Sequence, residues 1–266
     1  MGFSEKKSGD VRFMTASTIS ARHAFTTRFG GVSEGIYASM NLGTGRGDDD
    51  EKICENYRLL AQATGIDTFR MAFTKQVHKA DVRIVDEGDI HELFTAVPYE
   101  ADGIVTAARG LALICFTADC VPVLLHDSVH GVIGAIHCGW RSSVGDILGN
   151  ALEAMCSLGA ERKDICAAIG PAISRCCFQV GGEVIEAVEK WLDEDARSFY
   201  RRDESAEGKF LLDLKRCNAR RLVQLGVKEE NIAVSEECTK CSHEKYWSHR
   251  HTKGQRGSQG ALIVME

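Results

Sequence analysis

Two apolar runs that meet at a short polar turn restrict the fold more than any other part of the chain. They are "VPVLL" (121–125) and "GVIGAI" (131–136), joined by "HDSVHG" (126–131). Apolar runs this short, bounded by polar residues, are typical of strands buried on both faces, so helices must cover the sheet that contains them. Further strand-like runs are "RIVD", "GIVTA", "LALICF", "ICAAIG" and "GALIVM".

Four other segments carry the pattern of amphipathic helices, with apolar residues three or four positions apart. They are 48–65, 142–159, 182–200 and 213–226. We expect Ser142 or Ser143 to cap the second of these helices. Helical segments alternate with the strand-like runs, and no proline-rich or low-complexity linker separates them. The sequence therefore predicts one α/β domain over residues 1–266.

Composition and charge exclude several classes of protein. The formal net charge is -6, and nucleic-acid binding requires clustered lysine and arginine in excess, so we expect a small-molecule partner and no nucleic acid. No apolar run approaches the roughly 20 residues that span a bilayer, and "MGFSEKKSGDVRF" lacks a signal-peptide core. We therefore expect a soluble, cytoplasmic protein without a membrane partner. In that compartment the 11 cysteines are expected to be free thiols. The oligomeric state is not predicted.

The two apolar runs are expected to form a hairpin, which brings polar residues together at its open end. Cys120 precedes the first run and His137 follows the second, so the two side chains become neighbours. His126 and His130 belong to the turn and are expected to be solvated. His78, in the strand-like "TKQVHKADV", is a third candidate.

These residues have three open interpretations. Two imidazoles and one thiolate give a three-ligand zinc site with an open fourth position. Alternatively, Cys120 is a nucleophile, His137 its base and Asp119 the group that orients the base. The third interpretation is a purely structural polar cluster.

Two other motifs carry weaker signals. Cys238 and Cys241 form a C-x-x-C in "CTKCSHEKYWSHRH", followed by His243, His249 and His251. One interpretation of this pattern is a structural zinc site. The spacing of the ligands is irregular for such a site, so a metal is not favoured there. The segment "TTRFGGVSEG" lacks a Walker ending, so its two glycines are expected to form a turn that exposes Arg28.

With these residues assembled, the chain resembles the YfiH-like laccase-domain family, also described as multi-copper polyphenol oxidases or purine nucleoside phosphorylases. The resemblance rests on motifs in order along nearly the whole chain: "FTTRFGGVSEGIYASMNLG", "KQVHKADV", "ADGIVT", "TADCVPVLL", "HCGWRSS", "IGPAISRCCFQVG", "LDLKRCN", "CTKC" and "YWSHR". It implies that His78, Cys120 and His137 bind zinc. It also implies a fold with mixed β-sheets covered by helices, of the type shared with deamidase toxins that use a cysteine. Cys138, Ser142 and the ending "QRGSQGALI" depart from the family pattern.

The resemblance implies zinc-dependent phosphorolysis of adenosine, inosine and methylthioadenosine, with adenosine deamination as a companion activity. Asp119 would then move a proton beside its neighbour Cys120. Phosphate requires an anion site, for which Arg28 and Arg141 are the candidates because guanidinium groups bind phosphate in bidentate fashion. Asn41 and Gln76 are the candidates for hydrogen bonds to the base or ribose.

A copper-dependent polyphenol oxidase and a metal-free cysteine hydrolase remain the alternatives. Copper is a second candidate metal, but only as a single ion. The chain has 9 histidines, too few in paired motifs for a trinuclear copper cluster.

Overall fold

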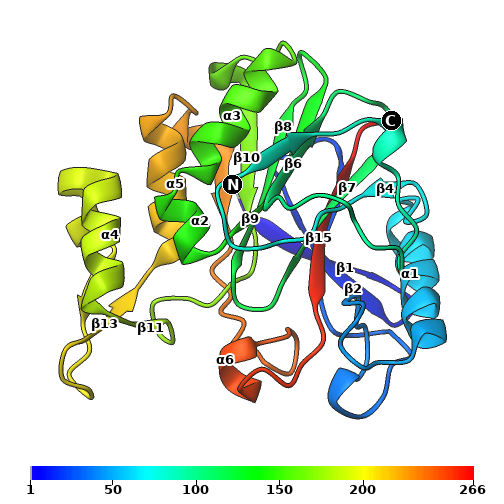
Figure 1. Ribbon diagram of the computed structural model, residues 1–266, viewed down its shortest axis with the longest axis horizontal. Helices are drawn as coiled ribbons and strands as arrows, with labels where there is room; N and C mark the ends of the chain where they lie inside the picture. The colour runs from blue at the N-terminus through cyan, green and yellow to red at the C-terminus, as the bar shows by residue number, and fades with distance from the viewer. Residues whose placement is uncertain (1) are drawn as a thin grey trace.

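The computed structural model describes residues 2–266, which form four layers in the order helix, sheet, sheet, helices (Figure 1). The first sheet has the strand order β1-β2-β3-β15-β7-β4 and the second β14-β10-β8-β9-β6-β5. Both sheets are mixed, because β4–β7, β10–β14 and β5–β6 pair in parallel while their other neighbours pair antiparallel. The predicted α/β fold with mixed sheets covered by helices is confirmed.

The strands and helices have the following bounds. In the first sheet the strands are β1 (Phe3–Ser8), β2 (Val11–Ala16), β3 (Arg22–Thr26), β15 (Gln259–Val264), β7 (Ala112–Thr117) and β4 (Met71–Ala72). In the second they are β14 (Ile232–Val234), β10 (Ile165–Ile169), β8 (Val121–Asp127), β9 (Val132–Cys138), β6 (Gly103–Thr106) and β5 (Val82–Ile84). A small third sheet contains β11 (Gln179–Gly181), β13 (Lys209–Leu212) and β12 (Tyr200–Arg202). The α-helices are α1 (Asp50–Thr64), α2 (Trp140–Val144), α3 (Ile147–Ser157), α4 (Gly182–Leu192), α5 (Leu214–Gln224) and α6 (His249–Thr252), and short 3-10 helices cover Gly35–Tyr37, Glu87–Asp89, Arg162–Asp164, Asp193–Ser198 and Glu229–Asn231.

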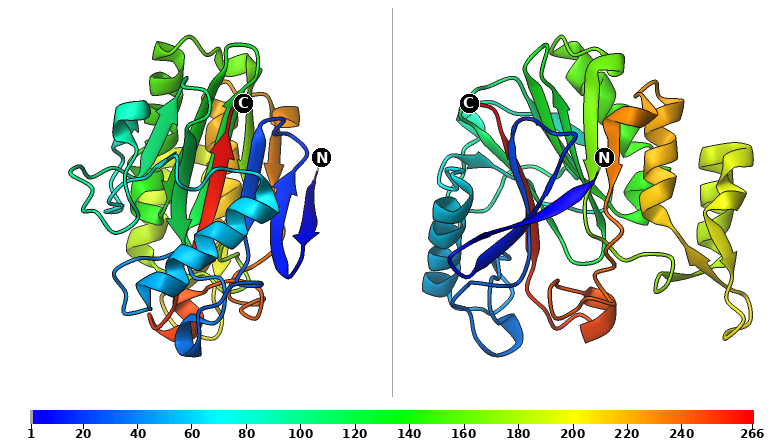
Figure 2. Two further views of the ribbon diagram at one scale, coloured as in Figure 1. Left: turned by 90° about the vertical axis from the view of Figure 1, so that its right-hand side faces the viewer. Right: turned by 180° about the vertical axis from the view of Figure 1, so that it is seen from behind.

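Three apolar cores separate the layers. Leu113 of β7 and Leu124 of β8 belong to the core between the two sheets. Tyr57 of α1 packs on the outer face of the first sheet, and Leu148 of α3 belongs to the core on the outer face of the second. Figure 2 shows α1 on one side and the other long helices on the opposite side. Because both faces of each central sheet are buried, the continuous apolar runs in the sequence are explained.

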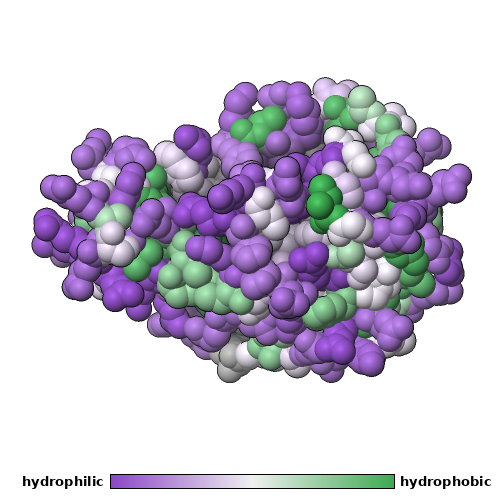
Figure 3. Space-filling model, turned by 90° about the horizontal axis from the view of Figure 1, so that it is seen from below, coloured by the Kyte–Doolittle hydropathy of each residue, from purple (hydrophilic) through white to green (hydrophobic). Residues whose placement is uncertain are grey.

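The outer surface is polar where it meets solvent. The face seen in Figure 3 is mainly hydrophilic, with small, separated hydrophobic areas. No helix of residues 2–266 is long and apolar enough to cross a bilayer.

The predicted hairpin is confirmed, with β8 and β9 antiparallel and Pro122 opposite His137. At its turn, His130 is exposed, as predicted, and its Nδ1 lies 2.8 Å from Asp127 Oδ2. The prediction that His126 is solvated is wrong. Strand β8 continues to Asp127, so His126 is buried within the sheet, where its Nδ1 lies 3.4 Å from the Ser20 hydroxyl.

Helix prediction succeeds at α1, which Asp49 caps and Gly65 ends in a left-handed conformation, and at α5, which Asp213 caps. The single helix predicted over 142–159 is wrong, because it is divided into α2 and α3. Asp146 adopts a left-handed conformation between them and receives hydrogen bonds from Arg221 at 2.6 and 2.7 Å. The ion pair between Asp146 and Arg221 joins the residue between α2 and α3 to α5, and it stabilises the left-handed conformation there.

Candidate metal centre

The three ligands predicted from the sequence lie together in the structure. His78, Cys120 and His137 each offer a donor atom, and all three donors lie within 4.8 Å of one another. The Cys120 Sγ atom is 3.8 Å from His78 Nε2, and the two imidazole rings are nearly perpendicular with centroids 4.9 Å apart. The cluster therefore has the spacing that one metal ion requires.

Different parts of the fold supply the three side chains. Cys120 lies in the turn that leaves β7 of the first sheet and enters β8 of the second, and His137 lies near the end of β9. His78 was expected in a strand, but it lies in the loop between β4 and β5 with a positive φ of 62°. Asp119, before Cys120, also has a positive φ, 89°. Such conformations are unfavourable for residues other than glycine and are concentrated at functional sites.

Asp102 holds this centre together, and the sequence analysis did not select it. Its two carboxylate oxygens accept hydrogen bonds from the backbone N–H groups of Val77, His78 and Lys79 at 2.9–3.0 Å. Oδ1 also lies 2.7 Å from His137 Nδ1. A carboxylate bonded to Nδ1 leaves Nε2 as the nitrogen available for a metal, an arrangement common around metal-binding histidines.

Glycine is required at position 139 because the chain passes close to His78. A Cβ atom on Gly139 would lie 2.8 Å from the His78 ring carbon Cδ2 and 3.6 Å from Cys120 Sγ. The glycine of "HCGWR" therefore leaves space for the His78 ring, whereas a distance of 3.6 Å from Cys120 Sγ is an ordinary van der Waals contact.

Charges in the centre favour a thiolate beside an imidazolium. Burial opposes ionisation of Cys120, but the neighbouring His137 and His78 overcome it and lower the pKa of the thiol to about 6. Burial alone would lower the pKa of His137, yet the charges of Cys120 and Asp102 raise it to about 9. Asp102 is itself held ionised: although burial raises its pKa, the bonds from His137 and the backbone N–H groups lower it further.

The donor set fits zinc. Two imidazole nitrogens and one readily ionised sulfur are ligands that zinc prefers, and three protein ligands leave one coordination position open. Two histidines and one cysteine also suit a single copper ion.

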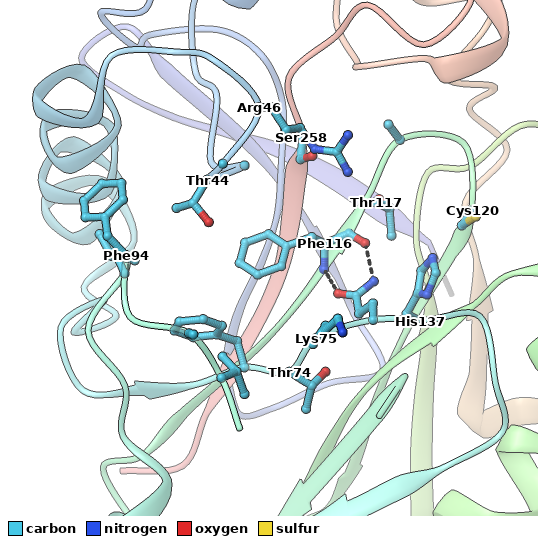
Figure 4. A pocket seen from close by; sticks show the side chains of 18 of the residues that line it. Thr44, Arg46, Thr74, Lys75, Phe94, Phe116, Thr117, Cys120, His137 and Ser258 are labelled. Carbon is cyan, nitrogen blue, oxygen red and sulfur yellow. Dashed lines mark hydrogen bonds between the residues drawn. The ribbon is translucent and has the colours of Figure 1, made fainter. Parts of the chain in front are cut away.

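The centre opens into a cavity of about 680 Å³, which is large enough for a nucleoside-sized molecule. Cys120 and His137 lie at one end, Phe116 lies further along and Phe94 lies at the far end (Figure 4). His78 lines the cavity beside Cys120 and His137. Arg46 lies along one edge between these two ends (Figure 4). The lining also includes Phe73, Leu93, Val97, Lys75, Arg256 and Ser258.

Gln76, predicted to bind substrate, does line this cavity. Its amide is already paired with the backbone of Phe116: Nε2 donates to the carbonyl at 2.8 Å and Oε1 accepts from the N–H at 2.7 Å. Gln76 thus attaches the ligand loop to β7.

The other predicted substrate-binding residues do not line the cavity. Asn41 is fully buried and bonds to Gly43, Asp48 and Ser258, so it shapes the cavity wall from behind. The exposed position predicted for Arg28 is wrong. Its half-buried guanidinium donates to the carbonyls of Ala38 and His243 and stacks over Trp247. Arg141 is exposed and lies over Trp140.

Asp119 lies beside Cys120 but is not among the residues that line the cavity. Oδ1 accepts from the Thr239 hydroxyl and Oδ2 from the Arg250 N–H, both at 2.6 Å.

Two cavity arginines were missed by the sequence analysis. Arg46 lies in the glycine-rich "GTGRGDDD" and Arg256 in "KGQRGSQG". Burial and the charge of Arg46 lower the pKa of Arg256 to about 10, so it stays protonated at neutral pH. The sequence signal that could have indicated them is an arginine in a glycine-rich loop: Arg46 lies between two glycines, and Arg256 lies directly before one.

Residues 22–266 match the family described as multi-copper polyphenol oxidoreductase laccase. The chain belongs to this family. A relative named purine nucleoside phosphorylase YlmD, from Geobacillus stearothermophilus, is 34% identical over 98% of this chain and 96% of its own length. A second relative, named adenosine deaminase RL5 and from an unknown prokaryotic organism, is 35% identical over 88% of this chain and 90% of its own.

Two solved structures have the same fold as this chain. The crystal structure of YlmD from Geobacillus stearothermophilus matches with a TM-score of 0.90 and 32% identity, covering 98% of each chain. That of YfiH from Bacillus licheniformis also matches with a TM-score of 0.90, at 28% identity over 98% of this chain and 99% of the other. The resemblance inferred from the motifs is therefore confirmed.

Proposed function

We propose that this protein is a purine nucleoside phosphorylase that acts on adenosine, inosine and methylthioadenosine and also deaminates adenosine. The observation that carries the proposal is the three-donor centre at one end of a cavity that also contains aromatic and arginine side chains. The names of the relatives at 34–35% identity support this assignment.

His78, Cys120 and His137 would hold the metal, which we propose to be zinc. Zinc bound by three protein ligands supplies a Lewis acid with an open coordination position. Asp102 keeps the proton of His137 on Nδ1, and its bonds to the 77–79 backbone fix the loop that carries His78.

The cavity offers one surface for the purine ring of the nucleoside and another for inorganic phosphate. Phe94 and Phe116 present apolar faces suited to a purine ring. Arg46 and Arg256 supply positive charge for inorganic phosphate. The guanidinium of Arg46 has no hydrogen bond to another side chain or carbonyl within residues 2–266, so its donors are free, whereas Arg256 donates to the Ser258 hydroxyl at 2.9 Å. Arg28 and Arg141 remain the alternative phosphate ligands, at positions outside the cavity.

A single reaction tests the assignment. Incubation with adenosine and phosphate should yield adenine with ribose 1-phosphate, together with inosine and ammonia, all resolved by chromatography. Cys120→Ala should lose both activities and the zinc ion of this centre, whereas Cys54→Ala, on α1 outside the cavity, should keep them. Unchanged adenosine with zinc-loaded protein would contradict the proposed function.

The family description supports a second candidate, oxidation of phenols with a single copper ion in the same centre. Copper-loaded protein would then consume oxygen in the presence of a phenol and leave adenosine unchanged. A metal-free cysteine hydrolase is the third candidate, supported by the low pKa of Cys120. It predicts activity that survives complete removal of metal.

A further inference from the structure

Four cysteine side chains form a second cluster outside the cavity. The Sγ atoms of Cys176, Cys177, Cys238 and Cys241 all lie within 4.8 Å of one another. Cys241 Sγ is 3.5 Å from Cys176 Sγ and 3.4 Å from Cys177 Sγ. All four are free thiols.

The fold brings together two cysteine pairs that lie far apart in the sequence. Strands β10 and β14 are parallel neighbours, and the chain continues beyond each of them into a turn that carries one pair. Ala172 and Cys238 form a β-bridge, and the Thr239 N–H donates to the Ala172 carbonyl at 3.1 Å. These contacts hold the two turns side by side.

The spacing matches a tetrahedral metal ion. Four sulfurs at the usual zinc–sulfur distance of about 2.3 Å stand about 3.8 Å apart, and the cluster would need only small shifts to reach that arrangement. A disulfide would use two of the four sulfurs and leave the other two without a role.

A backbone N–H group is directed at one of the sulfurs. The Ser174 N–H donates to Cys238 Sγ at 3.4 Å. N–H groups directed at a cysteine sulfur stabilise the thiolate form that binds metals.

Nearby cations would balance the charge of four thiolates. Lys215 is buried, and its ammonium donates to the carbonyls of Ser235 and Glu237, directly before Cys238. A cavity of about 470 Å³ beside Cys176 is lined by four cations, Lys215, Arg175, Arg201 and Arg216, and by two carboxylates, Asp213 and Glu236, which both pair with Arg216. Four thiolates around a divalent ion carry two net negative charges, so a cationic surrounding lowers the free energy of the loaded site.

We propose that Cys176, Cys177, Cys238 and Cys241 bind a structural zinc ion, separate from the metal centre in the cavity. The ion would fasten the turn after β10 to the turn after β14. The histidines considered from the sequence as partners of Cys238 and Cys241 are not in this group. His243 and His251 instead stack on each other, with ring centroids 3.7 Å apart.

Metal content and ligand type test this proposal on the full-length protein, purified under reducing conditions and supplied with zinc. Native mass spectrometry should find two zinc ions per wild-type chain and one in the double variant Cys176→Ser/Cys177→Ser. A matched control, Cys54→Ser/Cys156→Ser, changes two half-buried cysteines outside both clusters and should keep two.

The surviving site can be identified by X-ray absorption at the zinc edge. The double variant should show one sulfur and two imidazole ligands, whereas His78→Ala/His137→Ala should show four sulfurs. If the cysteine variant fails to fold, the histidine variant and the wild type still decide the question. No sulfur-only zinc in the histidine variant, or a reduced-buffer mass showing a Cys176–Cys241 or Cys177–Cys241 disulfide, would overturn the proposal. A single zinc per wild-type chain with four sulfur ligands would support it and count against a metal in the cavity centre.

Discussion

Replacing Asp102 with asparagine should weaken both the fold and the metal centre, because every orientation of the amide breaks bonds. If the new NH2 group takes the place of Oδ2, the backbone N–H groups of Val77 and Lys79 lose their acceptor. If it takes the place of Oδ1, the His78 N–H loses its acceptor. His137 Nδ1 must then accept a hydrogen bond, which places the ring proton on Nε2 and blocks metal binding there.

The magnitude follows from the number of bonds lost. Each of these part-buried bonds to a carboxylate contributes about 1–3 kcal/mol, so the loss of one or two of them should lower the free energy of unfolding by roughly 1–6 kcal/mol. Loss of the carboxylate beside a metal-binding histidine typically weakens metal affinity by roughly 10- to 100-fold. We expect Asp102→Asn to show both effects.

Asp127 provides a matched control, because it lies at the turn of the β8–β9 hairpin, at the end opposite to His137. It is fully buried, accepts from the N–H groups of Val129, His130 and Glu161 at 2.9–3.0 Å, and lies 2.8 Å from His130 Nδ1. Asp127→Asn should therefore destabilise the fold to a similar extent and leave zinc affinity unchanged. Denaturant unfolding measures the first quantity, and competition with a coloured zinc chelator the second. Equal zinc affinities in the two variants would refute the positioning role of Asp102.

Three further perturbations test the site. Gly139→Ala should displace the His78 ring and lower zinc affinity at least tenfold, since the new Cβ would lie 2.8 Å from Cδ2; unchanged affinity would show that the ring can move aside. Arg46→Ala should raise the KM for phosphate roughly tenfold or more, because phosphate loses a charge-assisted hydrogen bond, and the ratio of adenine to inosine should therefore fall. Arg28→Ala should lower both products alike, because the Arg28 guanidinium is bonded to backbone carbonyls. A lowered ratio in Arg28→Ala alone would instead place phosphate at Arg28. In metal-free protein, Cys120 should react with iodoacetamide with a midpoint near pH 6, because its pKa is lowered from 9.0 to about 6. A reactivity midpoint near pH 9 would contradict the ion pair with His137.

The local sequence pattern was sufficient to predict the part of the site that the β8–β9 hairpin brings together. Cys120 and His137 could be predicted as neighbours because antiparallel pairing of two adjacent runs leaves no other arrangement. The caps at Asp49 and Asp213 were readable because capping depends on a few consecutive residues.

Contacts between distant segments could not be read in this way. Asp102 bonds to residues more than twenty positions earlier, and nothing in "ADGIVT" shows which backbone it will meet. The partners of Cys238 were equally hidden, because Cys176 and Cys177 reach it only through the parallel pairing of β10 with β14. Arg28 was expected at the surface because the following glycines predict a turn. The carbonyls that bind its guanidinium come from Ala38 and from His243, more than two hundred residues away.

Asp119 connects the two cysteine-containing centres of the molecule. Its backbone carbonyl accepts from the Ile173 N–H at 3.0 Å, close before Cys176 and Cys177 in the chain. Its carboxylate is bonded to Thr239, which lies between Cys238 and Cys241, and to the N–H of Arg250. Buried carboxylates with two such bonds are held firmly, and moving a proton through Asp119 would require at least one bond to break. These contacts favour a positioning role, in which the segments tied by the four-cysteine cluster fix the left-handed turn that directs Cys120 toward His78 and His137.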